Sequence, residues 1–167
     1  DFIRVAAPNV ALETGDIIVS ASTHISSLRI GHAGLVVDGE NGEVLQATAY
    51  GQDTLIGHVT DFTSRINFIV LRPKASEEIK QKVAAYAKEN LVGIPYDAFA
   101  GVITHKDAIP RTQCAHVVWY AYKQFGVDLA NQNKLMILPY DLAGSDAVDV
   151  VQTFGFDPEK KWNKLIF

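Results

Sequence analysis

The hydrophobic pattern of the chain changes its period near Pro73. Before this residue, short apolar runs rich in β-branched residues alternate with turn residues, and such runs predict strands. They cover residues 15–20, 32–37, 43–49, 54–59 and 67–71. After it, apolar residues recur mostly at helical spacing. The pattern therefore predicts an α+β fold, with strands mostly in the first half and helices mostly in the second.

The second and third runs are separated by the sequence DGENG at residues 38–42. Asp, Asn and Gly are the residues that tight hairpin turns require, so these two runs are predicted to pair antiparallel. We expect the five runs to form an antiparallel meander, as a small sheet or a barrel packed against the helices.

Three helices are predicted after Pro73. The first begins at the capping residue Ser76 and ends before Gly93 and Pro95. The second carries an apolar stripe formed by Val117, Val118, Ala121, Tyr122 and Phe125, and it ends at Gly126. The third is expected around residues 141–153. Residues 93–111 read as a loop that leads to Cys114.

Length and composition restrict the class of protein. The 167 residues fit one domain, residues 1–167, and 48% hydrophobic with 20% charged residues is typical of a globular chain. The net charge of −4 disfavours nucleic-acid binding. Because no apolar segment reaches the about 18 residues of a membrane span, we expect no stable membrane insertion.

The first residue is Asp1 rather than Met, which fits a removed signal peptide or a shortened chain. We expect a secreted or cell-envelope protein, with the cytoplasm as the alternative, and a monomer.

Cys114 is the single cysteine of the chain, which excludes an internal disulfide and a Cys-rich metal site. Thr112 is a plausible helix cap, so Cys114 is expected in the first helical turn. There the N–H groups and the helix dipole should lower the thiol pKa and provide a donor for an oxyanion. Free cysteines are also among the most buried residues, so a purely structural role stays open.

A nucleophilic cysteine needs a base, and four of the five histidines are poor candidates. His116 lies two positions after Cys114, roughly 200° away around a helix, which favours a polar or capping role. His24 and His105 lie in polar or loop segments typical of the surface. His58 lies in a predicted strand and can face either way.

His32 is different because its neighbours are small. Gly31 precedes it and Ala33 and Gly34 follow it, which allows a helix end to approach closely. On the adjacent predicted strand, Gln46 can accept from one imidazole nitrogen and leave the other facing the thiol. A polar strand residue usually faces solvent, so this pairing stays one of two interpretations.

The order of these motifs resembles the YiiX/YebB-like branch of the permuted NlpC-type cysteine hydrolases. The motifs are GDII at 15–18, GHAGLVV at 31–37, VLQA at 44–47, GIPYD at 93–97, QCAHVVWYAY at 113–122 and LPYDL at 138–142. The resemblance covers about residues 14 to 143. It implies a circularly permuted papain-like fold, in which the His strand precedes a Cys helix with the nucleophile at its N-terminus.

The resemblance also implies roles for individual residues. Cys114 matches the nucleophile, His32 the base and Gln46 the residue that orients the imidazole, while Tyr96 matches a tyrosine that helps to polarise the substrate carbonyl. The third position is often acidic in such sequences, whereas Gln46 can orient a neutral imidazole but cannot stabilise imidazolium by charge. Ala115 stands where Ser is common.

The function that the resemblance implies is hydrolysis of an amide bond in cell-wall (peptidoglycan) peptides, through a Cys thioester. No metal or organic cofactor is expected, and Arg29 or Asp97 is expected to meet charged substrate termini. One alternative is a lipid-directed thiol acyltransferase or acylhydrolase resembling lecithin retinol acyltransferase. Another, motivated by Gln46 in place of an acid, is a binding relative without catalysis.

Overall fold

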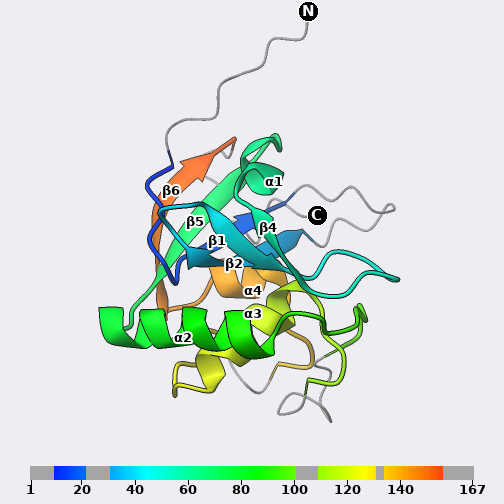
Figure 1. Ribbon diagram of the computed structural model, residues 1–167. Coiled ribbons are helices and arrows are strands. Elements are labelled where there is room, and N and C mark those ends of the chain that lie inside the picture. The colour runs from blue at the N-terminus through cyan, green and yellow to red at the C-terminus, as the bar shows by residue number, and fades with distance from the viewer. Residues whose placement is uncertain (1–9, 22–30, 101–108, 131–133, 156–167) are drawn as a thin grey trace, which may run out of the picture.

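A computed structural model describes residues 10–21, 31–100, 109–130 and 134–155. Its elements in chain order are β1 (Ile17–Ser20), β2 (His32–Asp38), β3 (Glu43–Gln46), β4 (Leu55–His58), α1 (Thr60–Thr63), β5 (Phe68–Pro73), α2 (Glu77–Asn90), α3 (Cys114–Lys123), α4 (Pro139–Ala143) and β6 (Val148–Phe154). The fold is mixed α+β, as predicted (Figure 1).

The six strands form one antiparallel sheet in the order β4-β3-β2-β1-β5-β6. In the described part of the chain the sheet is open, with β4 and β6 at its edges, so it is not a barrel. The predicted hairpin at residues 38–42 joins β2 to β3, with Leu35 opposite Leu45. The strands β1 to β4 follow one another as in the predicted meander, but β5 pairs with β1 rather than with β4, and β6 is added beyond it.

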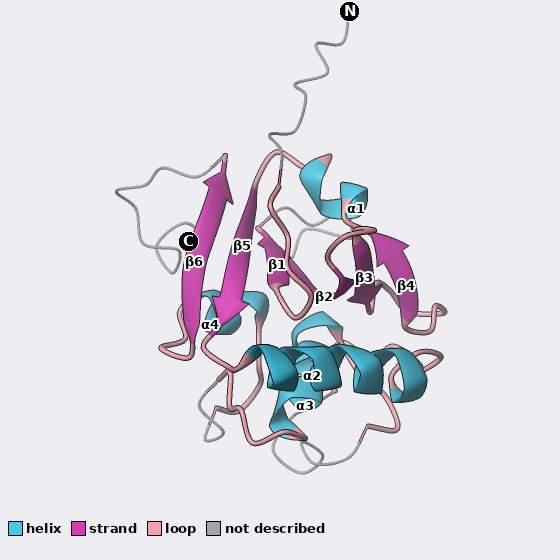
Figure 2. Cartoon of the chain, turned by 60° about the vertical axis from the view of Figure 1, so that its left-hand side comes forward, coloured by secondary structure: helices cyan, strands magenta, loops and turns pink. Residues whose placement is uncertain are grey.

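Both faces of the sheet are covered, because alternate strand residues point to opposite sides. One face carries Ile17, Leu35 and Leu71 and packs against α2 and α3, which lie together on that side in Figure 2. The other face carries Ile18, Val36 and Val70 and packs against Phe62 of α1.

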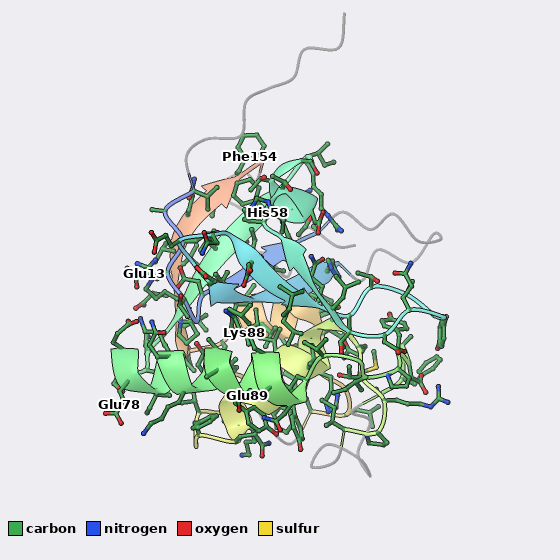
Figure 3. All side chains as sticks on the ribbon, viewed as in Figure 1. Glu13, His58, Glu78, Lys88, Glu89 and Phe154 are labelled. Atoms are coloured by element: carbon green, nitrogen blue, oxygen red, sulfur yellow. The ribbon has the colours of Figure 1, made fainter. Side chains whose placement is uncertain are left out.

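The long helix α2 begins as predicted. The Ser76 hydroxyl accepts from the Ile79 N–H at 3.2 Å, which satisfies one of the free N–H groups of the first turn. Lys88 lies on the side of α2 toward the sheet and pairs with Glu43 of β3 at 3.3 Å, whereas Glu78 and Glu89 lie on its outer side (Figure 3). None of the helices that the structure describes is both long and apolar enough to cross a membrane.

The predicted helix over residues 141–153 is wrong. The helix α4 ends at Ala143 with Gly144 as its C-cap, and β6 follows it and pairs antiparallel with β5. Val148, Val150, Val151 and Thr153 are β-branched and favour the extended backbone once the helix has ended. The short helix α1 was also not predicted from the sequence.

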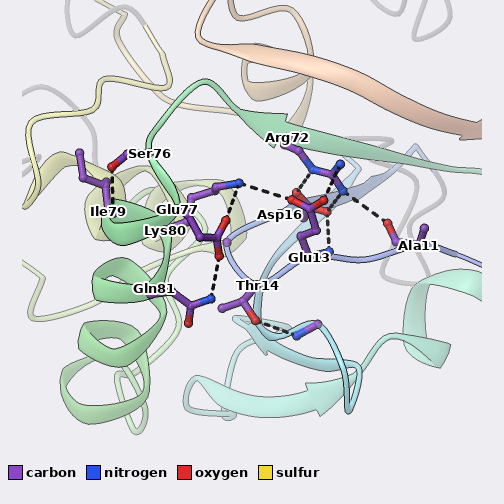
Figure 4. A network of polar contacts seen from close by, with 12 residues as sticks. Ala11, Glu13, Thr14, Asp16, Arg72, Ser76, Glu77, Ile79, Lys80 and Gln81 are labelled. Atoms are coloured by element: carbon purple, nitrogen blue, oxygen red, sulfur yellow. Dashed lines mark hydrogen bonds and ion pairs between the residues drawn. The ribbon is translucent and has the colours of Figure 1, made fainter.

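A buried ion pair connects β1 to β5. The Asp16 side chain is fully buried, and its carboxylate accepts from Arg72 Nε at 2.9 Å and from Nη2 at 2.8 Å (Figure 4). The Glu13 N–H donates to the same carboxylate at 2.9 Å. Lys80 of α2 pairs with Glu13 at 3.4 Å, so the network also reaches the helix layer.

Candidate functional site

Cys114 is the first residue of α3, in the first turn as predicted. The cap is Gln113 rather than the predicted Thr112: its side-chain oxygen accepts from the Ala115 N–H at 2.8 Å. The Gln113 amide nitrogen donates to the Ile137 carbonyl at 2.6 Å, which ties the start of the helix to the chain before α4. The Thr112 hydroxyl instead lies 3.0 Å from Nδ1 of His116.

The Cys114 thiol is buried, with 7% of the residue exposed. The predicted lowering of its pKa is wrong, because desolvation by burial raises the pKa of the thiol. The backbone N–H groups of Ala33, Ala115 and Cys114 itself oppose this effect, as does the charge of Arg65. Loss of water around the thiolate thus outweighs the helix terminus.

The predicted contact between His32 and Gln46 is present. His32 Nε2 lies 3.0 Å from Gln46 Oε1, and the residues are 7% and 2% exposed. The interpretation of Gln46 as a solvent-facing strand residue is therefore wrong. Burial lowers the pKa of His32 to about 4, although the hydrogen bond to Gln46 opposes the shift. The imidazole is consequently neutral at pH 7.

Cys114 and His32 meet through the backbone of β2. The backbone N–H of Ala33, the residue after His32, lies near enough to the Cys114 thiol to lower its pKa. Within the described residues no hydrogen bond joins the sulfur to the imidazole ring. Catalytic hydrogen bonds are often long before a substrate is bound, so this geometry is compatible with a nucleophile and its base.

Two residues of α1 complete the surroundings of the imidazole, and both were missed in the sequence. Asp61 Oδ2 accepts from Gln46 Nε2 at 2.8 Å, on the side of the amide opposite His32. The Phe62 ring stacks on the His32 ring, with centroids 5.0 Å apart and planes 9° from parallel. Gly57 inside a predicted strand was the available signal, because such a glycine marks a close approach.

Tyr96 lies beside the start of α3. A parallel bridge joins it to Thr112, and its ring meets Tyr50 edge-on at 5.2 Å. Burial and then the nearby Cys114 raise the pKa of the Tyr96 hydroxyl to about 12. The structure therefore brings this predicted site residue close to the thiol with its phenol proton in place.

Asp97 follows Tyr96 at the rim of this region. Its carboxylate accepts from the Phe99 N–H at 2.9 Å and contacts the Tyr50 hydroxyl at 3.4 Å. The predicted Arg29 lies outside the described residues. Of the two charged side chains expected to meet substrate termini, the structure therefore describes only Asp97.

In the described part of the chain, no hydrogen bond connects another histidine to the Cys114 thiol. His116 is fully buried, and its Nδ1 lies 3.0 Å from the Thr112 hydroxyl, consistent with the predicted polar role. His58 is exposed at the end of β4. His24 and His105 lie outside the described residues.

No protein-family model matches the sequence, and no curated protein matches it. Among solved structures, the chain is similar to the metalloprotein yiiX from Escherichia coli O157:H7 (DUF1105), with a TM-score of 0.67. The match covers 86% of this chain and 98% of that chain, at 18% sequence identity. At this identity the likeness shows a shared fold. This neighbour is consistent with the YiiX/YebB-like branch indicated by the sequence motifs.

The neighbour is named a metalloprotein, so the donor groups of the present site matter. Among the residues that the structure describes, no three His, Cys, Asp or Glu side chains are grouped as a metal ion would require. Cys114 and His32 offer two donors, and Nε2 of His32 is engaged with Gln46. The described residues therefore do not fit a metal centre.

Proposed function

We propose that this chain is a cysteine hydrolase that cleaves an amide bond in cell-wall (peptidoglycan) peptides, with a permuted papain-like fold of the NlpC type. One observation carries the proposal. A cysteine at the start of a helix lies near the backbone N–H of Ala33, and Ala33 follows a histidine whose Nε2 is 3.0 Å from Gln46 Oε1. Nucleophile, base and orienting group are the parts that thiol catalysis needs.

In the proposed reaction the Cys114 thiol gives its proton to His32 as the sulfur attacks the amide carbonyl carbon. The tetrahedral oxyanion then collapses, and the leaving amine takes the proton from the imidazolium. Water, deprotonated by His32, attacks the resulting thioester and releases the carboxylic acid and the free thiol. Atoms and protons balance over the cycle, and the described side chains supply every transfer.

The resting site holds neutral groups. Burial raises the pKa of Cys114 and lowers that of His32 to about 4, so a preformed thiolate-imidazolium pair is disfavoured. Proton transfer therefore accompanies the attack on the carbonyl. The Tyr96 hydroxyl, whose pKa is raised to about 12, can donate to the developing oxyanion, together with the N–H of Cys114.

A second candidate, a binding relative without catalysis, is favoured by this same neutrality. A thiol and an imidazole that are each 7% exposed could be core groups. The fold shared with yiiX does not distinguish the two, because fold does not determine activity.

The decisive experiment is incubation of the protein with a panel of muropeptides and N-acyl lipids, with product release followed by mass spectrometry. We expect cleavage of a muropeptide amide and loss of cleavage in Cys114→Ala and His32→Gln. Cleavage of N-acyl lipids alone would move the assignment to the acyl-transfer alternative. Equal rates for wild type and Cys114→Ala would refute the hydrolase.

A further inference from the structure

The short helix α1 contacts the imidazole of His32 by two routes. Phe62 stacks on the ring directly, and Asp61 reaches it through the Gln46 amide. The two contacts come from adjacent residues of one helical turn. They therefore hold both the plane of the imidazole and the group that accepts its proton.

The hydrogen bonds of this chain of groups have a fixed polarity. A carboxylate at neutral pH has no hydrogen to donate, so Gln46 must turn its NH₂ toward Asp61. Its carbonyl oxygen then faces His32, and a carbonyl can only accept. The imidazole must therefore carry its hydrogen on Nε2, which leaves the lone pair on Nδ1.

The backbone of β4 leaves room for this arrangement. A Cβ at Gly57 would lie 2.4 Å from Gln46 Nε2 and 2.7 Å from Asp61 Oδ2. Both distances are shorter than real Cβ contacts, so any larger residue would push the amide and the carboxylate apart. The sequence thus has a glycine inside a strand, where glycine is unfavourable, at the point where these two groups meet.

We propose that Asp61 is a positioning residue that fixes the orientation of the Gln46 amide and thereby the tautomer of His32. The Asp61 carboxylate is thus linked to the imidazole through the Gln46 amide, one hydrogen bond beyond the direct partner of His32. This inference deepens the proposed function and rests on it for its catalytic meaning, but the tautomer itself is measurable without turnover.

The test is nitrogen NMR of protein labelled with ¹⁵N-histidine, with the His32 signals assigned by their loss in His32→Gln. Wild type should show His32 protonated at Nε2. In Asp61→Asn the new amide can turn its NH₂ toward Gln46 by giving up the long 3.3 Å contact from the His58 N–H. Gln46 can then face either way, so both His32 tautomers should be present. We expect the alkylation rate of Cys114 to fall about tenfold in this variant.

Exchanging the amide of Gln46 and the carboxylate of Asp61 should restore the single tautomer of His32. In the double variant Gln46→Glu with Asp61→Asn, the introduced carboxylate accepts from His32 Nε2–H and from the introduced amide, so the single Nε2 tautomer and the alkylation rate should return. Gln46→Glu alone puts two carboxylates at the 2.8 Å contact and should lose it. The matched control is Asp149→Asn, because Asp149 lies on β6 at the other edge of the sheet.

Each outcome decides the inference. A single Nε2 tautomer in Asp61→Asn, or no rescue in the double variant, would overturn it. If Asp61→Asn does not fold, Gly57→Ala tests the same contact with every polar group retained. Should wild type cleave no substrate while the tautomers behave as expected, the proposed function fails and the positioning role of Asp61 stands.

Discussion

Two buried polar groups of this molecule are held in opposite ways. Asp16, at 0% exposure, is surrounded by donors, and Arg72 meets its carboxylate with two hydrogen bonds. The hydrogen bond to Asp16 raises the pKa of Arg72, so the guanidinium is held charged. His32, by contrast, has a neutral amide as its partner and a pKa of about 4, so it is held uncharged.

The difference indicates which group is available for chemistry. The Asp16 carboxylate accepts three hydrogen bonds, two from Arg72 and one from the Glu13 N–H, which assigns it to the stability of the fold. A neutral imidazole beside a neutral thiol retains a lone pair and a proton that can be exchanged during a reaction. The lowered pKa of His32 is therefore the feature that a proposed catalytic group would have, whereas the hydrogen-bonded carboxylate of Asp16 has a structural role.

The largest expected loss of stability follows from disrupting the ion pair between Asp16 and Arg72. Arg72→Met removes the cation and leaves the buried carboxylate of Asp16 without its main partner. Because an uncompensated buried charge is costly, the free energy of unfolding should fall by about 3–5 kcal/mol in urea titrations. Cleavage per folded molecule should be unchanged, since Arg72 is not part of the site.

The control is Lys74→Met, because Lys74 pairs with Asp149 at 3.7 Å while both side chains are more than half exposed. This pair is screened by water, and its loss should cost less than about 1 kcal/mol. Equal losses in the two variants would contradict the role assigned to Asp16.

The pH dependence of stability tests the His32 side. Burial lowers the pKa of His32 from 6.5 to about 4, so between these values the unfolded chain binds a proton that the folded chain does not. This contribution to stability is present above pH 6.5, is lost as the pH falls toward 4, and amounts to about 3 kcal/mol.

The measurement compares urea unfolding of wild type and His32→Gln at neutral pH and near the lower value. The difference between the two proteins should shrink as the pH falls, because glutamine does not titrate. An unchanged difference would mean that folding does not shift the pKa of His32, and a growing difference would mean that His32 is held charged.

Much of the fold, and part of the candidate site, could be predicted from local sequence patterns. The strand runs, the Ser76 cap and the apolar stripe of α3 are short-range patterns, and the structure contains them. The contact between His32 and Gln46 could also be predicted, because a hairpin turn makes β2 and β3 neighbours in the sheet.

Other features depend on tertiary contacts that no local pattern encodes. The thiol pKa was predicted from the helix terminus alone, whereas burial by the packed sheet decides its direction. Asp61 follows an edge strand in a four-residue helix, too short for a periodic signal. The strand β6 is not evident from the sequence, because its valines gain their partners only by pairing with β5.

An intermediate effect is expected from Gly57→Ala, which inserts a methyl group between Gln46 and Asp61. Overpacking of this kind should lower the free energy of unfolding by about 2 kcal/mol. The matched control is Gly144→Ala, where a Cβ would meet the Tyr140 carbonyl at 3.3 Å and should cost much less. The same loss of stability in both variants would remove the argument that Gly57 serves the amide contact.

The smallest expected effects come from removing one hydroxyl on each side of the comparison. Tyr122 is fully buried and donates to the Gly15 carbonyl, next to Asp16, so Tyr122→Phe leaves a buried acceptor unsatisfied and should cost about 1 kcal/mol. Tyr96 is only partly buried, and Tyr96→Phe should change the unfolding free energy little while lowering kcat about tenfold or more. Urea titrations and cleavage kinetics on the two variants separate these effects.

Because the pKa of the Tyr96 hydroxyl is raised to about 12, its contribution to kcat should not vary between about pH 6 and 9. A stability loss at Tyr96 equal to that at Tyr122, with kcat intact, would place Tyr96 with the structural groups around Asp16 and remove it from the proposed oxyanion site.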